Sequence, residues 1–207
     1  MDDTNISVVI SGVGGQGVIL ASDLIAEVGL AHGLDVKKAE VHGMAQRGGS
    51  VISHIRLGPT VHSPMVSRRS AHVLCALEPL EAIRYVEYVR ADGAIFYNSH
   101  RHVPLTAIFG TVPYPEDPGA VLGRYASRVV EVEALRIALE LEVPEAVNVV
   151  MLGAISSTLP FTRDEWMAAI EKKVKARFVE VNKVAFRKGL AVEGGSAPTA
   201  HEPPSTV

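Results

Sequence analysis

The sequence has very little cysteine: Cys75 is the single one among 207 residues. Disulfide frameworks, cysteine-type zinc sites and cysteine-ligated iron–sulfur clusters each need several cysteines, so this chain alone cannot form any of them. Cys75 itself lies within an apolar run. That position predicts an inert, buried thiol.

The sequence also lacks a large excess of charges of one sign, and it lacks a long apolar run. Twenty lysines and arginines stand against 23 aspartates and glutamates, for a formal net charge of −3. Such a balance argues against a general binder of nucleic-acid phosphates. No apolar stretch reaches the roughly 18 residues that a membrane span needs, and the acidic start Met1-Asp2-Asp3 lacks the cationic region of a signal peptide. We therefore expect a soluble, cytoplasmic protein that binds neither nucleic acid nor membrane.

What the sequence does contain is the composition of an ordinary globular protein, with 47% hydrophobic and 21% charged residues. The length predicts one domain, over residues 1–192. Residues 193–207 are rich in glycine, proline and serine and have almost nothing to bury. They predict a disordered tail.

Short apolar runs rich in β-branched residues alternate with helical patterns over the first two thirds of the chain. Strands are predicted at residues 7–10, 71–77, 94–97 and 129–132. A helix is predicted to open at Glu78-Pro79 and to close at residues 91–93. Residues 51–57 and 60–66 flank Gly58-Pro59 and predict a hairpin. The alternation indicates a three-layer α/β/α fold around a largely parallel or mixed sheet.

The last third of the chain has a helical pattern. Helices are predicted at residues 133–141, 146–159 and 178–190, the second of them apolar nearly all round and therefore buried. Thr162 and Glu165 have the spacing of a capping box, and Phe161 and Trp166 that of a hydrophobic staple. A helix is therefore predicted to begin at Thr162.

A glycine-rich turn follows the first predicted strand and precedes a predicted helix, in which Ala21, Leu24, Ile25 and Val28 recur at helical spacing and which should end near His32-Gly33. Gly12, Gly14 and Gly17 satisfy the pattern G-x-G-x-x-G, which can place backbone N–H groups against a phosphate. The alternative is a tight turn without a ligand. Binding of NAD further requires an acidic residue about 20 positions on, at the end of the second strand. Asp35 and Glu40 have that spacing, but Lys37-Lys38 interrupt the segment, which weakens the NAD interpretation.

A second unusual segment, residues 40–50, is dense in glycines and polar side chains. Arg47 precedes Gly48-Gly49, so its guanidinium fork could lie beside exposed backbone N–H groups and hold a phosphate or carboxylate. An internal salt bridge between Arg47 and Glu40 is the equal alternative.

Other candidate residues predict less. His54 and His62 could face each other across the hairpin, and His100 and His102 are two apart, but neither pair has a third ligand nearby, so no metal site is predicted. No G-x-S-x-G elbow exists. Arg68-Arg69 could meet an anion or a partner, but ordinary surface charge is the stronger explanation.

The two glycine motifs together carry a family resemblance. GVGGQG after a first strand, followed by KKAEVHGMAQRGGSV, resembles the gamma-subunit family of the 2-oxoacid:ferredoxin oxidoreductases, and within it the small (beta) subunits of indolepyruvate-type enzymes. The sequences NVVMLGA, LPF and VEVNKVAF of the last third also fit. The resemblance covers roughly residues 5–190.

The resemblance implies a subunit of an enzyme that oxidatively decarboxylates an aryl-2-oxoacid to its acyl-CoA and passes electrons to ferredoxin. Thiamine diphosphate, Mg and the iron–sulfur clusters are then expected in the large partner subunit. This chain is expected to have no catalytic residue of its own. Its expected role is to help assemble the enzyme and position the parts of its active site, and it can bind coenzyme A. By the same resemblance, the residues near the CoA diphosphate or the subunit interface are Gly12, Gly14, Gly15, Gln16, Gly17, Arg47 and Gly48.

Overall fold

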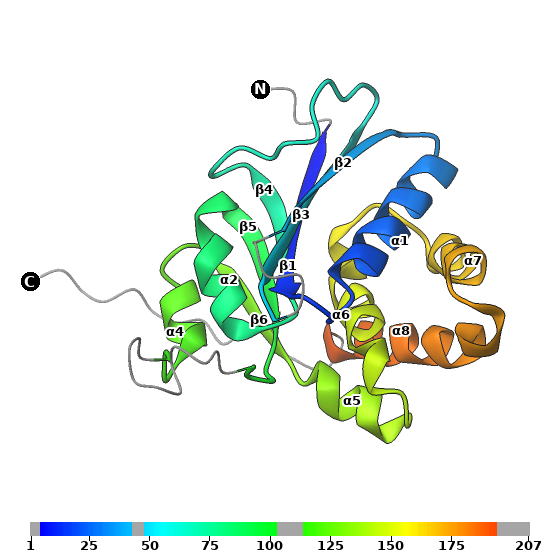
Figure 1. The fold of residues 1–207 in the computed structure, drawn as a ribbon. Coiled ribbons are helices and arrows are strands. Elements are labelled where there is room, and N and C mark those ends of the chain that lie inside the picture. Colours follow the sequence, from blue (N-terminus) through cyan, green and yellow to red (C-terminus); the bar gives the residue numbers. More distant parts are fainter. Residues whose placement is uncertain (1–4, 43–47, 103–113, 194–207) are drawn as a thin grey trace, which may run out of the picture.

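The computed structural model describes residues 5–42, 48–102 and 114–193, which form one six-stranded sheet with helices on both sides (Figure 1). The strands are β1 (Ile6–Val13), β2 (Asp35–His42), β3 (Ser50–Gly58), β4 (Ala71–Ala76), β5 (Val89–Asn98) and β6 (Arg128–Val132). Their order in the sheet is β2-β3-β1-β4-β5-β6. Strand β3 runs antiparallel to both of its neighbours, and β1, β4, β5 and β6 are mutually parallel. The prediction of a mixed sheet is confirmed.

Helices cover both faces of the sheet, as the predicted three-layer fold requires (Figure 1). One face carries α1 (Val18–Ala31), α5 (Ala134–Glu140), α6 (Val147–Ile155), α7 (Arg163–Lys173) and α8 (Val179–Glu193). The other carries the two short helices α2 (Pro79–Tyr85) and α4 (Pro118–Leu122). In the described part of the chain, no helix combines the length and apolarity that crossing a bilayer demands.

The core consists of two apolar clusters, one on each face of the sheet. Successive side chains of a strand point to opposite faces, so Val8 and Ile10 of β1 join the larger cluster while Val9 joins the smaller one. All three side chains are fully buried. Strand β1 is thus buried on both faces, as its continuous apolar run predicts.

The predicted helices of the last third are confirmed. Thr162 caps α7, its hydroxyl accepting from the Glu165 N–H while the Glu165 carboxylate accepts from the Thr162 N–H. The Phe161 and Trp166 rings lie 6.0 Å apart between centroids, as a staple requires. Helix α6 is buried all round and crosses α8 at Gly153, where an added methyl group would strike the Phe186 carbonyl.

Two predicted elements are wrong. Residues 60–66 form no strand, because β3 pairs with β1 and β2 and the chain beyond it bonds irregularly: Val61 donates its N–H to the Asp35 carboxylate (2.9 Å). His54 is therefore not opposite His62, and it packs against the Tyr88 ring instead. The helix from Glu78 ends at Tyr85 rather than at residues 91–93, because β5 already begins at Val89. The predicted tail, except Glu193, lies outside the described residues.

Candidate functional site

The glycine-rich turn connects β1 to α1 as predicted. Gly15 (φ 106°) and Gly17 (φ 85°) are both left-handed, a conformation that glycine adopts without steric penalty. The Gln16 N–H donates to the Val13 carbonyl (3.0 Å), and the Gln16 side-chain oxygen accepts from the Val13 N–H (2.7 Å). Gln16 therefore holds the turn closed, and its oxygen is not directed at an external ligand.

Two of the three pattern glycines lie close against side chains of the chain itself, which by itself favours glycine there. A methyl group at Gly12 would lie 3.0 Å from Gln16 and from Val18. One at Gly17 would strike the side-chain amide of Asn148, which donates to the Gly17 carbonyl (3.1 Å). Asn148 is the first residue of NVVMLGA on α6 and the one polar residue of that run. A polar side chain in an otherwise apolar, buried helix indicates a specific hydrogen-bond partner, a signal that the prediction from sequence did not use.

Gly15 has no such neighbour: apart from the adjoining chain, no heavy atom of the described residues lies within 4 Å of the position a methyl group would take. Helix α1 starts directly after the turn, and the first N–H groups of a helix have no acceptor within the helix. The backbone N–H groups at Gly15 and at the start of α1 can therefore donate hydrogen bonds to an anion.

The second glycine motif is joined to the first. Gly14 donates its N–H to the Gly49 carbonyl (2.8 Å), and Gly48, itself left-handed at φ 73°, donates to the Gly14 carbonyl (3.4 Å). Arg47, the remaining candidate of this segment, lies outside the described residues. The structure thus brings Gly48 to the turn and leaves the position of the Arg47 side chain as a prediction.

The additional requirement for NAD is not met by this topology. A dinucleotide-binding fold places its second strand beside the first, whereas β3 separates β2 from β1 here. Asp35 is paired with Lys37 (2.6 Å), whose hydrogen bond lowers the pKa of the Asp35 carboxyl group. Glu40 is paired with Lys38 (2.8 Å). Neither carboxylate is free beside the end of β1 to hold a ribose.

Across from the turn lies a buried carboxylate, Glu78, which directly follows β4 and Leu77 and is 1% exposed. Its side chain accepts from the N–H groups of Glu81 (3.0 Å) and His102 (3.2 Å) and from the hydroxyl of Tyr114. Burial and the bond to Glu78 raise the pKa of Tyr114. The sequence predicted Glu78 only as the start of a helix.

Glu81 is a second buried carboxylate, 4% exposed. It accepts from the hydroxyl of Ser50 and from Arg84 Nε (3.0 Å), and the hydroxyls of Ser50 and Tyr85 lie 2.8 Å apart. Because Ser50 is the register partner of Val13, this cluster adjoins the glycine-rich turn. No set of three or more His, Cys, Asp or Glu side chains suited to a metal ion occurs among the described residues.

The turn and the two carboxylates lie at the place in the sheet where α/β proteins usually bind ligands. The helix after β1 and the helix after β4 cover opposite faces (Figure 1). The carboxyl ends of these adjacent parallel strands therefore form a topological switch point. We call this place the crevice, after its position in the topology: Gly15 and the start of α1 lie on one side of it, and the buried carboxylates of Glu78 and Glu81 lie on the other.

Comparison with known proteins assigns the chain to a family. Residues 7–192 match the family described as pyruvate ferredoxin/flavodoxin oxidoreductase. The chain belongs to this family. Its members among the curated proteins include the indolepyruvate oxidoreductase subunit IorB of Archaeoglobus fulgidus, 35% identical, with 94% of this chain and 98% of the relative aligned. The subunit IorB of Thermococcus kodakarensis is 34% identical, with 89% and 94% aligned.

Solved structures agree with the fold. The gamma subunit of a keto/oxoacid ferredoxin oxidoreductase from Geobacter sulfurreducens superposes with a TM-score of 0.69 at 20% identity, covering 92% of this chain and 99% of that one. A 2-oxoglutarate:ferredoxin oxidoreductase from Magnetococcus marinus gives 0.72 at 18% identity, covering 98% of this chain and 33% of the longer one. The family resemblance predicted from the two glycine motifs is confirmed, and the chain is an oxidoreductase subunit of the 2-oxoacid:ferredoxin type.

Proposed function

We propose that this chain is the small subunit of an indolepyruvate-type 2-oxoacid:ferredoxin oxidoreductase. The assembled enzyme converts an aryl-2-oxoacid and coenzyme A to the acyl-CoA and CO₂, with ferredoxin accepting the electrons. The observation that carries this proposal is the match to indolepyruvate oxidoreductase subunits, which are 33–35% identical over most of their length.

The thiamine diphosphate, Mg and iron–sulfur clusters of such an enzyme belong to the large partner subunit in this proposal. An iron–sulfur cluster does not fit this chain, since Cys75 is its only cysteine and is fully buried. Burial raises the pKa of the Cys75 thiol to about 12, which disfavours the thiolate that ligation requires. What remains for this chain is binding, positioning and assembly.

The crevice is the proposed contact for coenzyme A. Gly15 and the start of α1 leave backbone N–H groups and open space for a diphosphate. Gly12, Gln16 and Gly17 shape that turn, and Gly14 links it to the segment of Arg47 and Gly48. The buried carboxylates of Glu78 and Glu81 on the other side would repel a diphosphate, which favours its placement beside the glycines.

A second candidate role is assembly alone, with the turn contacting the large subunit rather than a ligand. The specific observation behind it is the internal packing at Gly12 and Gly17. Because that packing already accounts for glycine at these two positions, the pattern can be explained without an anion.

The test of the main proposal is co-expression of the chain with its thiamine-binding subunit, followed by an assay of CoA-dependent oxidation of aryl-2-oxoacids with ferredoxin. The complex should turn over, and the chain purified alone should be colourless and inactive. Redox activity of the isolated chain would contradict the proposal, as would tight NAD binding.

The variant Arg47→Ala separates CoA binding from assembly, with Arg163→Ala on α7 as the matched control. If the crevice holds CoA, Arg47→Ala raises KM for CoA in an intact complex, and Arg163→Ala does not. An unchanged KM together with weaker complex formation would favour the assembly role instead.

A further inference from the structure

A serine hydroxyl joins the start of β3 to helix α2 beside the glycine-rich turn. Ser50 is the first residue of β3 and directly follows Gly48-Gly49. Its hydroxyl donates to the Glu81 carboxylate and lies 2.8 Å from the Tyr85 hydroxyl, and both of these partners belong to α2. Ser50 therefore links the second glycine motif to the helix that follows β4.

Ser50 lies at the end of the described strand ladder. Among the described residues, the pairs between β2 and β3 end at His42 and Val51. On the other side the register partner of Ser50 is Val13, whose N–H and carbonyl both bond to Gln16 of the turn. The side-chain bonds of Ser50 therefore fix the start of β3 where the ladder runs out.

Glu81 is a firmly held acceptor for this bond. Its buried carboxylate also accepts from Arg84 Nε (3.0 Å). Its N–H donates to the Glu78 carboxylate (3.0 Å), and its carbonyl accepts from the buried hydroxyl of Ser11 on β1 (3.3 Å). The main chain and the side chain of Glu81 are thus both anchored, so its carboxylate can define where Ser50 lies.

The position of Ser50 is passed to the turn through two backbone hydrogen bonds. Its neighbour Gly49 accepts from the Gly14 N–H (2.8 Å), and Gly48 donates to the Gly14 carbonyl (3.4 Å). Neither Gly48 nor Gly49 has a side chain that could anchor it, so Ser50 is the first residue of this run that can. Because Gly14 directly precedes Gly15, a shift at the start of β3 would displace the backbone N–H groups that the turn can offer to an anion.

We propose that Ser50 and Glu81 are positioning residues for coenzyme A: the carboxylate holds the Ser50 hydroxyl, and Ser50 holds Gly48-Gly49 against Gly14 in the geometry that receives the diphosphate. This inference rests on the coenzyme A contact proposed above. Groups that bind a ligand must be held to within about 0.5 Å of the productive geometry. The charge of Glu81 by itself would repel a diphosphate, whereas its bond to Ser50 favours binding, so the two effects have opposite signs and can be separated.

The test measures CoA binding to the co-purified complex by calorimetry, together with KM values in the ferredoxin assay. Ser50→Ala removes the hydroxyl. We expect it to raise the dissociation constant and the KM for CoA about tenfold, since a hydrogen bond to a charged group is worth at least about that factor. The KM for the 2-oxoacid should stay within about twofold. Ser50→Thr keeps the hydroxyl on a residue type suited to strands and should restore the affinity for CoA.

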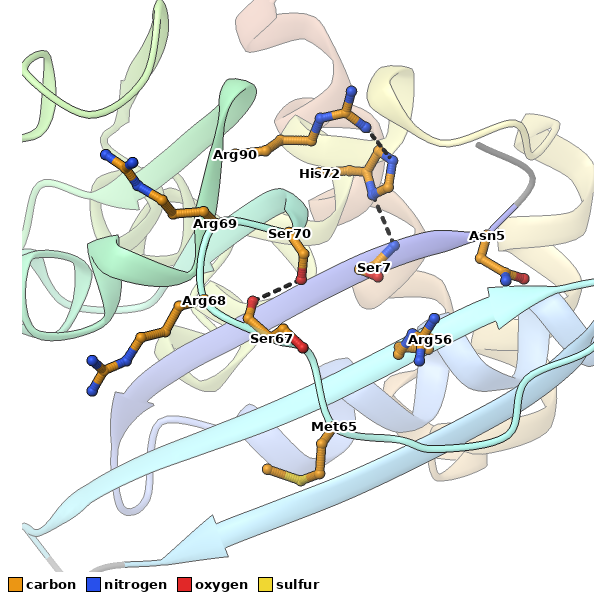
Figure 2. Close-up of a pocket in the computed structure, with 10 residues that line it drawn as sticks. All are labelled: Asn5, Ser7, Arg56, Met65, Ser67, Arg68, Arg69, Ser70, His72 and Arg90. Carbon is orange, nitrogen blue, oxygen red and sulfur yellow. Dashed lines mark hydrogen bonds between the residues drawn. The ribbon is translucent and has the colours of Figure 1, made fainter. Parts of the chain in front are cut away.

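Ser70→Ala is the matched control, because it removes a serine hydroxyl at the opposite end of the sheet. Figure 2 shows the Ser70 hydroxyl donating to the Ser67 carbonyl (2.7 Å) beside a cavity at the amino ends of the parallel strands. Ser7, which lines the same cavity, is six residues from Val13 along β1, roughly 20 Å at about 3.3 Å per residue. Ser70→Ala should therefore change the affinity for CoA less than about twofold.

A double-mutant cycle shows whether Glu81 acts through Ser50. Glu81→Gln removes the repelling charge and replaces the charged acceptor of the Ser50 bond by a weaker, neutral one. We expect Glu81→Gln to weaken CoA binding in the unaltered chain and to lose this effect in the Ser50→Ala background. Equal effects in both backgrounds would overturn the inference. If Ser50→Ala does not assemble, Glu81→Gln alone decides, and unchanged or tighter CoA binding overturns it.

The remaining outcomes separate this inference from the proposed function. If Arg47→Ala raises the KM for CoA and Ser50→Ala does not, the coenzyme A contact stands and the positioning role is refuted. If neither variant changes the affinity for CoA, the contact fails and the positioning role fails with it. An equal loss of affinity in Ser50→Thr or in Ser70→Ala would indicate general destabilisation and would also refute the positioning role.

Discussion

Replacing Gly17 by alanine tests whether the glycine-rich turn is held by the packing of the chain itself. At φ 85° an alanine side chain is in the left-handed region, which costs about 1–2 kcal/mol. Its methyl group would also strike the Asn148 amide, and overpacking of this kind typically costs about 1–3 kcal/mol. We therefore expect Gly17→Ala to lower the free energy of unfolding by about 2–5 kcal/mol, a large share of the total for a domain.

A double-mutant cycle with Asn148→Ala separates the two contributions, using urea unfolding followed by circular dichroism. Asn148→Ala alone removes a hydrogen bond to the Gly17 carbonyl, worth about 1 kcal/mol. In that background Gly17→Ala should retain only the backbone cost of about 1–2 kcal/mol. Gly15→Ala is the control, because its φ is 106° but, apart from the adjoining chain, no heavy atom of the described residues lies within 4 Å of the added methyl group. Equal costs of Gly17→Ala in both backgrounds would refute the reasoning.

Three further predictions concern other parts of the molecule. Gly153→Ala should destabilise the chain by about 3 kcal/mol in urea unfolding, because the methyl group strikes the Phe186 backbone carbonyl, which cannot rotate away. The hydrogen bond from His32 holds the pKa of Glu165 at about 2, below its ordinary 4.5. The stability difference between the unaltered chain and Glu165→Gln should thus be fully present at about pH 4.5 and shrink as the pH falls through 2, as acid unfolding curves can show. Burial raises the pKa of Cys75 to about 12, so at pH 8 iodoacetamide should label it only after denaturation, as mass spectrometry can detect.

Each of these has an outcome that would contradict it. A stable Gly153→Ala chain would mean that α6 and α8 do not cross as closely as described. A pH profile of Glu165→Gln that matches the unaltered chain, or one that His32→Gln fails to reproduce, would remove the assigned cause of the pKa shift. Rapid labelling of the native Cys75 would show that the β4 strand opens readily.

Elements whose signals are local could be predicted from the sequence. The Thr162 capping box and its staple involve residues within five positions, and both form as expected. The glycine-rich turn is likewise a short strand-to-helix connection, found where its pattern placed it. Such signals depend on backbone geometry that is determined by residues close together in the sequence.

Strand pairing could not be predicted in the same way. Residues 51–57 were correctly expected to be extended, but their periodicity does not say which strand they join. Its partners are β2, the strand directly before it in the chain, on one side and β1, which α1 and β2 separate from it in the sequence, on the other. Lys37 and Lys38 interrupt the apolar pattern of β2 because it is an edge strand, where lysine side chains can reach solvent and exposed carboxylates.

The candidate site was predicted only in part, because some of its residues come together through contacts between distant parts of the sequence. Both glycine motifs stood out locally, and the structure joins them through Gly14 and Gly48. Asn148 was missed because it reaches Gly17 across 131 positions. Glu78 and Glu81 were missed because an acidic residue at a helix start has an ordinary local explanation, and only the sheet order brings them beside the turn.

The position of β3 between β1 and β2 explains why the glycine pattern alone is not sufficient evidence for dinucleotide binding. In a dinucleotide-binding fold the place beside the end of β1 is taken by the second parallel strand, with its acidic residue. Here the antiparallel β3 begins at that place, so Gly48 and Gly49 are bonded to Gly14 instead. Gly12 and Gly17 are needed for packing in either case. For the coenzyme A contact proposed above, we therefore expect substitutions at Gly48 and Gly49, which lead into β3, to change ligand affinity more than substitutions at Gly12 and Gly17 do.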